Sequence, residues 1–450
     1  MTGVRVLRRL AGLVLLALMM AVPSAFAAPG VQPTVVDTDA DPGTSFDVTK
    51  TVTTEEIPPN PDIVFLADTT GSMGPAIGNV KTNINNIIAD VEASQPTAQF
   101  GVAQYRDREH CPADPFDVRL DQAVTDDNTL VVNAVNALAL GDGCDFPENG
   151  LVALTFLATD PTVGYRADST RIVVWFGDAP QHVDGNGPTV ADTIAALQAA
   201  GIRVIAIDVG ALDSTGQATA ITDATGGVLL PGGGDVSGAI LAGLSSLPVE
   251  VTPEVVSCDT GLSASFDPAS QTVTSGDDAV FTETVTVAAD APQGSTLSCT
   301  VRFLIDGEPA GDAFTQSISV DVNDVTAPVA ACTATVNPAG KTVPAAGNNP
   351  KSGQNPDGFY ELTATDAVDP NPQIFVVDTG SGTVFGPFPS GTRIKYTEDA
   401  TATPEQKGMG GPNSAVTIHI IGTGDAAVHA VDASGNQSAP VACLVPGPPK

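Results

Sequence analysis

Three oxygen-bearing side chains follow a short apolar stretch near the start of the chain. Residues 63–67 are all apolar, and Asp68, Thr70 and Ser72 come next at every second position. A carboxylate and two hydroxyls on a tight loop can direct hard oxygen atoms at one point, which suits a divalent cation such as Mg²⁺. The same residue types are also favoured as helix N-caps. The spacing predicts a metal site, with helix capping as the alternative.

Apolar strands and amphipathic helices surround this motif. Apolar residues recur every three or four positions between Ile77 and Val91, which predicts a helix directly after the motif. Further strands are expected at 101–103, 171–177 and 203–209, and helices near 129–140, 149–158, 190–200 and 235–247. This alternation is typical of a mostly parallel sheet covered on both faces, which binds ligands at the carboxyl ends of its strands. Asp178 follows one such strand, so we expect it beside Asp68.

On these residues the chain resembles a von Willebrand factor type A (VWA) domain that carries a metal-ion-dependent adhesion site. The resemblance covers residues 58–249 and rests on four segments: 68–72, the Asp-Phe-Pro-Glu loop at 145–148, 175–180, and the Thr-Gly-Gly at 225–227. It implies an α/β doubly wound, Rossmann-like fold. It also implies that Asp68, Thr70 and Ser72 hold the metal directly or through water, together with Asp178.

The second loop of the site departs from the pattern of many VWA domains, which place a Thr there. Residues 141–148 contain no Thr, and the glutamate after Pro147 resembles the variant of integrin β subunits and hemicentin-type domains. The resemblance therefore implies Glu148 as a ligand. The alternative places Glu148 in the first turn of the next helix, where an acidic residue is favoured. Mg²⁺ is the expected cation, with Ca²⁺ and Mn²⁺ as alternatives because an extra carboxylate makes the site more anionic.

Two further acidic residues lie near the site loops. Asp107 comes just past a strand end, and Asp145 lies in the second loop. Both are candidates for a secondary metal site or for the surroundings of the first, and the alternative for Asp107 is a solvated loop. His110 and His182 flank the same loops and are expected to serve as polar loop residues.

The N-terminal residues have the pattern of a cleaved secretion signal. Residues 1–27 contain three arginines, then an apolar run, then Ala-Phe-Ala. Residues 28–57 are expected to be a linker, and no later stretch has the roughly 18 apolar residues of a membrane-spanning helix. The tail at 447–450 shows no anchoring pattern. We therefore expect a protein that is secreted or held at the cell surface.

Composition argues against two classes of function. The formal net charge is −34, which disfavours nucleic acid as a partner because binding there depends on neutralising phosphates with Lys and Arg. The sequence contains no Gly-x-Ser-x-Gly, no His-Glu-x-x-His and no phosphate-binding loop with its Lys. We therefore expect a protein that is not an enzyme.

Six cysteines in an exported chain indicate disulfides. Six cysteines allow 15 pairings, but two fall in each predicted domain. One bridge per domain gives Cys111–Cys144, Cys258–Cys299 and Cys332–Cys443. The first would tie the loop after Tyr105 to the loop that carries Glu148, and the second would join the two sheets of its module.

After Pro248 the composition changes to Thr, Val and Ser with period-two alternation. Residues 250–323 contain Asp306-Gly307, a hairpin turn signal, and are expected to form an immunoglobulin-like β-sandwich. Residues 324–446 repeat the all-β pattern, and 430–438 resembles the last strands of bacterial immunoglobulin-like or hyalin-repeat modules. The stretch 340–358 is expected to be a long loop. The fold class is thus multidomain, with two all-β immunoglobulin-like sandwich domains after the VWA domain.

These features predict an exported, metal-dependent binding or adhesion protein. The VWA domain would use its divalent cation to capture an acidic group of a protein or extracellular-matrix ligand. The alternative is a structural or assembly component of a cell-surface layer, in which the metal only stabilises the VWA domain. The sequence does not choose among ligands, because fold-level analogy does not specify them.

Overall fold

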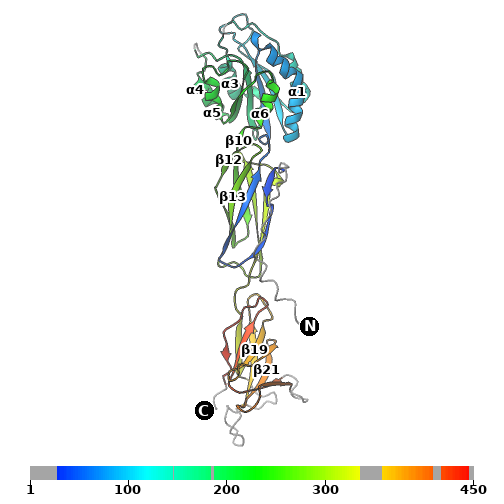
Figure 1. Ribbon diagram of the computed structural model, residues 1–450, viewed down its shortest axis with the longest axis vertical. Coiled ribbons are helices and arrows are strands. Elements are labelled where there is room, and N and C mark those ends of the chain that lie inside the picture. Colours follow the sequence, from blue (N-terminus) through cyan, green and yellow to red (C-terminus); the bar gives the residue numbers. More distant parts are fainter. Residues whose placement is uncertain (1–27, 145, 184–186, 335–356, 409–416, 445–450) are drawn as a thin grey trace.

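The computed structural model describes residues 28–144, 146–183, 187–334, 357–408 and 417–444. These form an elongated molecule of three parts arranged end to end (Figure 1). An α/β domain lies at one end, a β-sandwich in the middle, and a second β-sandwich at the other end. The predicted signal at 1–27, Asp145, most of the predicted loop at 340–358 and the tail at 447–450 lie outside the described residues.

A six-stranded sheet forms the centre of the α/β domain, in the order β6-β5-β4-β7-β8-β9. Its strands are β4 (Pro61–Asp68), β5 (Gln99–Tyr105), β6 (Val118–Thr125), β7 (Thr170–Gly177), β8 (Ile202–Asp208) and β9 (Val228–Pro231). All neighbours pair in parallel except β5 and β6, which are antiparallel. The mostly parallel sheet expected from the sequence is confirmed, and the half-buried edge strand β6 was not predicted.

Strand β4 is buried on both faces of this sheet. Phe65 and Ala67 belong to one hydrophobic core, whereas Val64 and Leu66 belong to the other. Because successive side chains of a strand point to opposite faces, a continuously apolar strand must be covered twice. The covering helices are α1 (Gly74–Ser94), α2 (Asn128–Ala137) and α6 (Val236–Leu244) on one face, and α3 (Gly150–Thr159), α4 (Val190–Ala199) and α5 (Gln217–Thr225) on the other. The short, Thr-rich α5 was not predicted.

The middle sandwich is built from chain segments on both sides of the α/β domain. One sheet contains β1 (Gly30–Gln32), β3 (Ser45–Thr53), β13 (Asp278–Val287) and β11 (Leu262–Asp267). The other contains β12 (Gln271–Thr274), β10 (Pro248–Cys258), β14 (Thr296–Ile305), β16 (Thr315–Val322) and β2 (Val35–Ala40), with β15 (Glu308–Pro309) beside β14. The α/β domain is therefore inserted into this sandwich between β3 and β10.

The prediction that residues 28–57 form a linker is wrong. Val31 and Val52 are buried in the core of the middle sandwich, where they are joined by Phe281. The strand that pairs with β3 is β13, which is remote in sequence. Across this pair, Ser45 and Thr286, 241 positions apart, form a side-chain hydrogen bond. The middle sandwich therefore comprises residues 30–53 as well as the predicted downstream module.

The chain enters and leaves the α/β domain at adjacent points. Just after β3, the carbonyl of Glu55 accepts a hydrogen bond from Gly276 N at 2.8 Å. Just before β10, the carbonyl of Leu247 accepts one from Ser275 N at 2.9 Å. Both crossings therefore contact the same turn of the middle sandwich.

The C-terminal sandwich confirms the all-β character expected downstream. One sheet has the order β17 (Val329–Ala334), β18 (Asp357–Thr365), β21 (Thr392–Glu398), β23 (Thr417–Gly422) and β22 (Glu405–Gly408). The other has the order β20 (Val384–Phe388), β19 (Gln373–Asp378), β24 (Ala426–Val431) and β25 (Val441–Ala442). Leu362 and Ile394 of the first sheet share a core with Ile374 and Val428 of the second. The immunoglobulin-like type of both sandwiches stays a prediction.

All three disulfides pair as expected from the sequence. Cys258 and Cys299 lie opposite each other on β10 and β14, which are neighbours in one sheet. The expectation that this bridge joins two sheets is therefore wrong. The bridge of the C-terminal sandwich does so instead, because Cys332 lies in β17 and Cys443 directly follows β25.

Candidate metal centre

The predicted metal ligands gather at the carboxyl end of the sheet in the α/β domain. Asp68 is the last residue of β4, and Asp178 directly follows the parallel neighbour β7. Thr70 and Ser72 lie in the loop that leads from β4 into α1. Glu148 lies in the loop before α3. The carboxyl ends of neighbouring parallel strands adjoin. The topology therefore brings the loop after β4, with Thr70 and Ser72, next to the loop after β7, with Asp178.

Asp68 is fully buried and only partly hydrogen-bonded. Its Oδ1 accepts hydrogen bonds from the backbone N of Thr70 at 2.9 Å and from Thr70 Oγ1 at 2.7 Å. Its Oδ2 is also buried but accepts no hydrogen bond from any described residue. Burying a carboxylate oxygen without a partner is unfavourable because nothing replaces its hydration. A divalent cation would compensate for this loss, so these residues fit a metal.

The alternative role of Asp68, Thr70 and Ser72 as N-caps of the following helix requires side-chain hydrogen bonds from a cap residue, and these are not found among the described residues. The short 3₁₀ helix η1 (Gly71–Met73) follows Thr70, and α1 follows Met73. Neither helix receives a side-chain hydrogen bond from its N-cap residue. Thr70 Oγ1 donates to Asp68 instead, and Ser72 is exposed. The hydroxyls therefore remain available at the loop, as a metal site needs.

The loop that carries Glu148 is held against the loop after β7. The backbone N of Glu148 donates to Pro180 O at 2.9 Å, and the N of His182 donates to Glu148 O at 3.0 Å. The Glu148 side chain is buried beside Thr70: a Cβ added at Gly143 would lie 2.9 Å from Thr70 and 3.1 Å from Glu148 Oε1. Glu148 also precedes α3 rather than lying in its first turn. This placement supports the glutamate as a ligand.

Three carboxylates act on the hydroxyl of Tyr105, which lies beneath the site. Burial raises the pKa of Tyr105 well above its ordinary value, and the negative charges of Asp68, Glu148 and Asp178 raise it further. The same hydroxyl accepts a hydrogen bond from Trp175 Nε1 at 3.1 Å. All three carboxylates therefore lie near enough to this hydroxyl for their negative charges to act on it.

Burial raises the pKa of Asp68 to about 7. The hydrogen bonds from Thr70 and the nearby backbone amide of Asp178 oppose this rise, and the negative charge of Asp178 adds to it. Without a cation, the site therefore holds a carboxyl group that ionises only near neutral pH. A bound cation would favour the ionised form, because an opposite charge stabilises a carboxylate.

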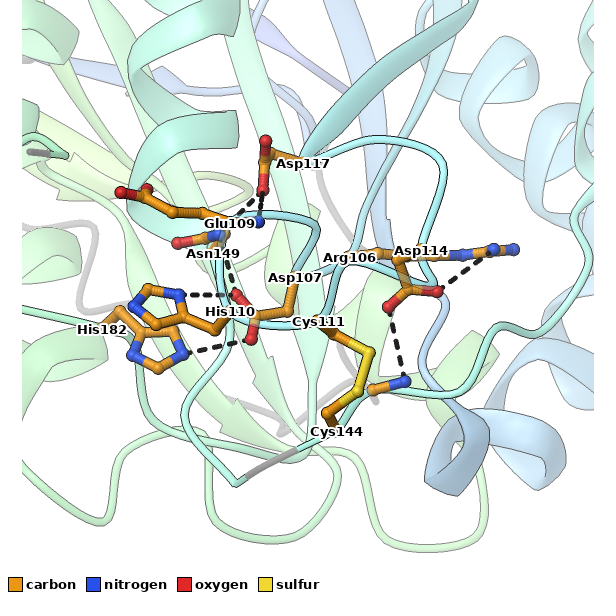
Figure 2. Close-up of a disulfide and its surroundings, with 11 residues drawn as sticks. Arg106, Asp107, Glu109, His110, Cys111, Asp114, Asp117, Cys144, Asn149 and His182 are labelled. Atoms are coloured by element: carbon orange, nitrogen blue, oxygen red, sulfur yellow. Dashed lines mark hydrogen bonds and ion pairs between the residues drawn. A yellow bond between two sulfur atoms is a disulfide. The ribbon is translucent and has the colours of Figure 1, made fainter. Parts of the chain in front are cut away.

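A disulfide braces the rim of the site, as predicted (Figure 2). Cys111 and Cys144, whose Cα atoms are 5.2 Å apart, join the loop after β5 to the loop that leads to Glu148. Beside it, Asp114 Oδ1 lies 3.6 Å from Arg106 Nη1, and Asp114 Oδ2 accepts from Gly143 N at 3.4 Å. The disulfide and the hydrogen bond between Asp114 and Gly143 therefore fasten the same two loops.

Asp107 lies in this braced region, where it contacts two imidazole rings (Figure 2). Its Oδ1 lies 3.1 Å from His110 Nδ1, and its Oδ2 lies 3.3 Å from His182 Nε2. The two rings stack with centroids 3.6 Å apart and planes 10° apart. An ion bound by an imidazole lies near the ring plane, and two nearly parallel planes at this separation share no such point. The stacked rings suit hydrogen bonding to Asp107, but one ligand atom from each of Asp107, His110 and His182 lies within 4.8 Å of the others, so the secondary metal site stays a prediction.

Asp107 also supports the loop of the second ligand. Its Oδ1 accepts a hydrogen bond from Asn149 Nδ2 at 2.8 Å, and Asn149 is the neighbour of Glu148. Asn149 Nδ2 also donates to Asp117 Oδ1 at 3.0 Å. These contacts are consistent with the prediction that Asp107 belongs to the surroundings of the first metal site. Asp145, the other candidate, lies outside the described residues.

Two buried glutamines, Gln181 and Gln217, hold the loop after β7 in place. The sequence does not mark either as a site residue. Gln181 Oε1 accepts from Gly150 N, at the start of α3, at 2.5 Å. Gln217, at the start of α5, accepts from Gln181 N at 2.7 Å and donates to Gln181 O at 2.9 Å. Because these contacts join three remote segments, no local spacing marks them.

Comparisons with known proteins identify this part of the chain. Residues 62–227 match the von Willebrand factor type A domain family. The "Alpha-protein kinase vwkA" of Dictyostelium discoideum is 28% identical over 127 residues, which are 27% of this chain and 19% of that protein. This chain therefore spans about a fifth of the length of that relative.

Solved structures with similar chains include the von Willebrand factor type A protein from Catenulispora acidiphila. It is 12% identical, with a TM-score of 0.33 over 66% of this chain and 75% of that one. Proximal thread matrix protein 1 from the mussel byssus is 16% identical, with a TM-score of 0.32 over 44% of this chain and 47% of that one. The family match and the six-stranded sheet together show that residues 62–227 form a von Willebrand factor type A domain.

Proposed function

We propose that this protein is an exported adhesion protein whose VWA domain holds a divalent cation, Mg²⁺ in the first instance, to capture an acidic group of a protein or matrix ligand. VWA domains commonly mediate protein binding, which supports the general role. One observation carries the metal dependence: Asp68 Oδ2 is buried at the centre of the site and accepts no hydrogen bond from the described residues.

Asp68, Thr70, Ser72, Glu148 and Asp178 would hold the cation. Asp68, Thr70 and Glu148 are buried, whereas Ser72 is exposed and Asp178 half-buried. A ligand would therefore approach from the side of Ser72 and Asp178. The cation would bind the ligand's carboxylate through an open coordination position. The buried carboxylates of the site would balance the rest of the cation's positive charge.

Two features support an extracellular location. Residues 1–27 have the pattern of a secretion signal, and three disulfides are typical of proteins in oxidising compartments. Within the described ranges, no helix is long and apolar enough to cross a membrane. The two sandwiches also leave the metal-bearing domain at one end of the molecule (Figure 1), which suits presentation to a partner.

Calorimetric titration with Mg²⁺ tests the metal centre, using the chelated chain from residue 28 onwards. Asp68→Ala should remove one class of site. Asp160→Ala is a matched control, because Asp160 Oδ1 accepts from Thr162 N at 2.9 Å and from Thr162 Oγ1 at 2.6 Å, nearly as Asp68 does from Thr70. The control should keep that site. Identical titrations for wild type and Asp68→Ala would refute the metal centre.

Ligand capture needs a second experiment, because metal binding alone does not establish adhesion. A random-peptide display library is bound in Mg²⁺ and eluted with EDTA. The wild type should enrich peptides with Asp or Glu, and changing that residue to its amide should abolish binding. The Asp68→Ala variant should not enrich peptides that contain Asp or Glu. Normal Mg²⁺ binding without acidic peptides would favour the alternative, in which the metal only stabilises the domain and the sandwiches make the contacts.

A further inference from the structure

Three carboxylates meet where the connector between the sandwiches reaches the C-terminal sandwich. Asp324 lies in the connector between β16 and β17, Asp366 directly follows β18, and Asp432 directly follows β24. One oxygen from each lies within 4.8 Å of those from the other two. Residues far apart in the sequence therefore form one acidic cluster at the junction, remote from the VWA domain (Figure 1).

Two of these carboxylates each have a buried oxygen without a partner. Oδ2 of Asp324 and Oδ2 of Asp366 are shielded from solvent and accept no hydrogen bond within the part of the chain that the structure describes. The Oδ1 atoms are held in place: that of Asp324 accepts from Thr326 N at 3.1 Å, and that of Asp366 accepts from Val368 N at 2.8 Å. Each side chain is thus oriented by one oxygen while the other is left unsatisfied, which is unfavourable without a ligand.

The third carboxylate is the most deeply buried: Asp324 and Asp366 are partly buried, whereas Asp432 is only 7% exposed. Asn436 Nδ2 donates to Asp432 Oδ2 at 2.9 Å and to the backbone O of Asp324 at 2.9 Å. Among the described residues, no Lys, Arg or His forms an ion pair with any of the three aspartates. One neutral amide cannot balance three negative charges at this separation, so the cluster lacks a cation.

We propose that Asp324, Asp366 and Asp432 bind a Ca²⁺ ion that fastens the connector to the C-terminal sandwich. The donors are all oxygens, which excludes the nitrogen and sulfur ligands that Zn²⁺ prefers. Ca²⁺ accepts several carboxylates and carbonyls in flexible geometry, whereas Mg²⁺ usually keeps several waters and takes one or two carboxylates. Three carboxylates from three separate segments therefore fit Ca²⁺ better.

The ion would stiffen the junction between the sandwiches. Gln293 of the middle sandwich already accepts hydrogen bonds from Val325 N and Thr326 Oγ1, both at 2.9 Å. Gly294 also touches the C-terminal sandwich, because a Cβ there would lie 2.4 Å from Val368. Ca²⁺ would add a bond from Asp324 to two loops of the C-terminal sandwich and so restrict bending at this joint.

Hydrogen exchange on the chain from residue 28 onwards, in Ca²⁺ and in EGTA, tests the proposal. Peptides covering 323–334 and 364–371 should exchange at least tenfold more slowly in Ca²⁺. Asp68→Ala should show the same protection, because the VWA site is separate. Asp366→Asn combined with Asp432→Asn should lose it, whereas Asp369→Asn should retain it. Asp369 is a matched control: it lies in the same loop, and its carboxylate accepts from Ala433 N at 2.8 Å.

Two results would overturn the proposal: equal exchange of the wild type in Ca²⁺ and EGTA, or full Ca²⁺ protection in the double variant. Folding of the variants is checked by slow exchange in EGTA of peptides from β19 and β24. If the double variant fails that check, Asp324→Asn decides, because residue 324 lies outside both sandwiches. It should weaken Ca²⁺ binding at least tenfold, and unchanged affinity would equally refute the site.

Discussion

Replacing Asp68 by Asn is expected to stabilise the VWA domain when metal is absent, although it removes a proposed metal ligand. Asp68 is fully buried, and its Oδ2 accepts no hydrogen bond from the described residues. Above about pH 7 the aspartate must therefore carry its negative charge in a site that disfavours it. Asn has nearly the same shape but never ionises, so the variant avoids this penalty.

The size of the effect follows from the pKa of Asp68, which burial raises from 3.8 to about 7. The folded protein then holds the proton to a higher pH than the unfolded chain does. Stability from this group is therefore fully present below pH 3.8, falls as the pH rises, and is lost above about pH 7. Three pKa units correspond to about 4 kcal/mol. We expect a gain of about 2–4 kcal/mol for Asp68→Asn at pH 8.5, and little difference from wild type near pH 4.

Trp175 allows this domain to be followed within the whole chain. It is the single tryptophan of the sequence and is buried in the VWA domain. Its fluorescence during urea unfolding in EDTA, at pH 4 and pH 8.5, gives the free energy of unfolding of wild type and variant. In Mg²⁺ at 1,000 times its Kd the advantage of the variant should be lost or reversed, since the ion then stabilises the wild type by about 4.1 kcal/mol and the variant binds it weakly.

Asp62→Asn is the matched control, because Asp62 is also fully buried and lies at the other end of β4. Its carboxylate accepts from Arg166 N and from Arg166 Nε, both at 2.7 Å. Removing this charge leaves a partly exposed guanidinium unpaired, so this variant should be less stable than wild type by about 1–3 kcal/mol. If Asp68→Asn also destabilises the metal-free domain at pH 8.5, the account of an uncompensated carboxylate is refuted.

Two further predictions concern stability away from Asp68. Lys50→Met should destabilise the middle sandwich by about 3–5 kcal/mol, because Lys50 Nζ lies 3.4 Å from Glu283 Oε2 and both side chains are fully buried. Adding Glu283→Leu should recover most of the loss in scanning calorimetry, and no recovery would contradict the role of the unpaired charge. Replacing Cys111 and Cys144 by Ser opens a bridge between residues 33 positions apart and should cost about 3–4 kcal/mol. It should also weaken Mg²⁺ binding, and unchanged calorimetric affinity would show that the bridge does not position the Glu148 loop.

The sequence predicts best what is encoded within a few neighbouring residues. The run from Ile63 to Ser72 indicates a buried strand, a loop and a helix, and the structure contains all three. Asp306-Gly307 predicts a hairpin, and both residues have the positive φ that such a turn requires, 53° and 84°. These features depend on local backbone preferences, so a single sequence reveals them.

Features that depend on remote partners were missed. Strand β3 has a readable alternation, but its neighbour β13 lies across the inserted domain, so residues 28–57 were interpreted as a linker. The pair Cys258–Cys299 was correct, yet its relation to the sheets required the order of β10 and β14. Gln181 beside the candidate metal site and Asp324 at the junction have contacts between separate segments, which no local pattern marks.

The inserted VWA domain has a consequence for the order in which the chain folds during synthesis. Strands β1 to β3 leave the ribosome long before β13 and β16, so their edges wait unpaired while the VWA domain is made. Domains generally fold as units as they emerge. Because Glu55 and Leu247 both bond to the turn at 274–277, a folded VWA domain holds the two crossings together. Without the folded VWA domain, pairing β3 with β13 would have to close a long loop at a large entropic cost. With the two crossings already held together, the loop to be closed is short. We therefore expect the VWA domain to act also as a folding template for the sandwich into which it is inserted.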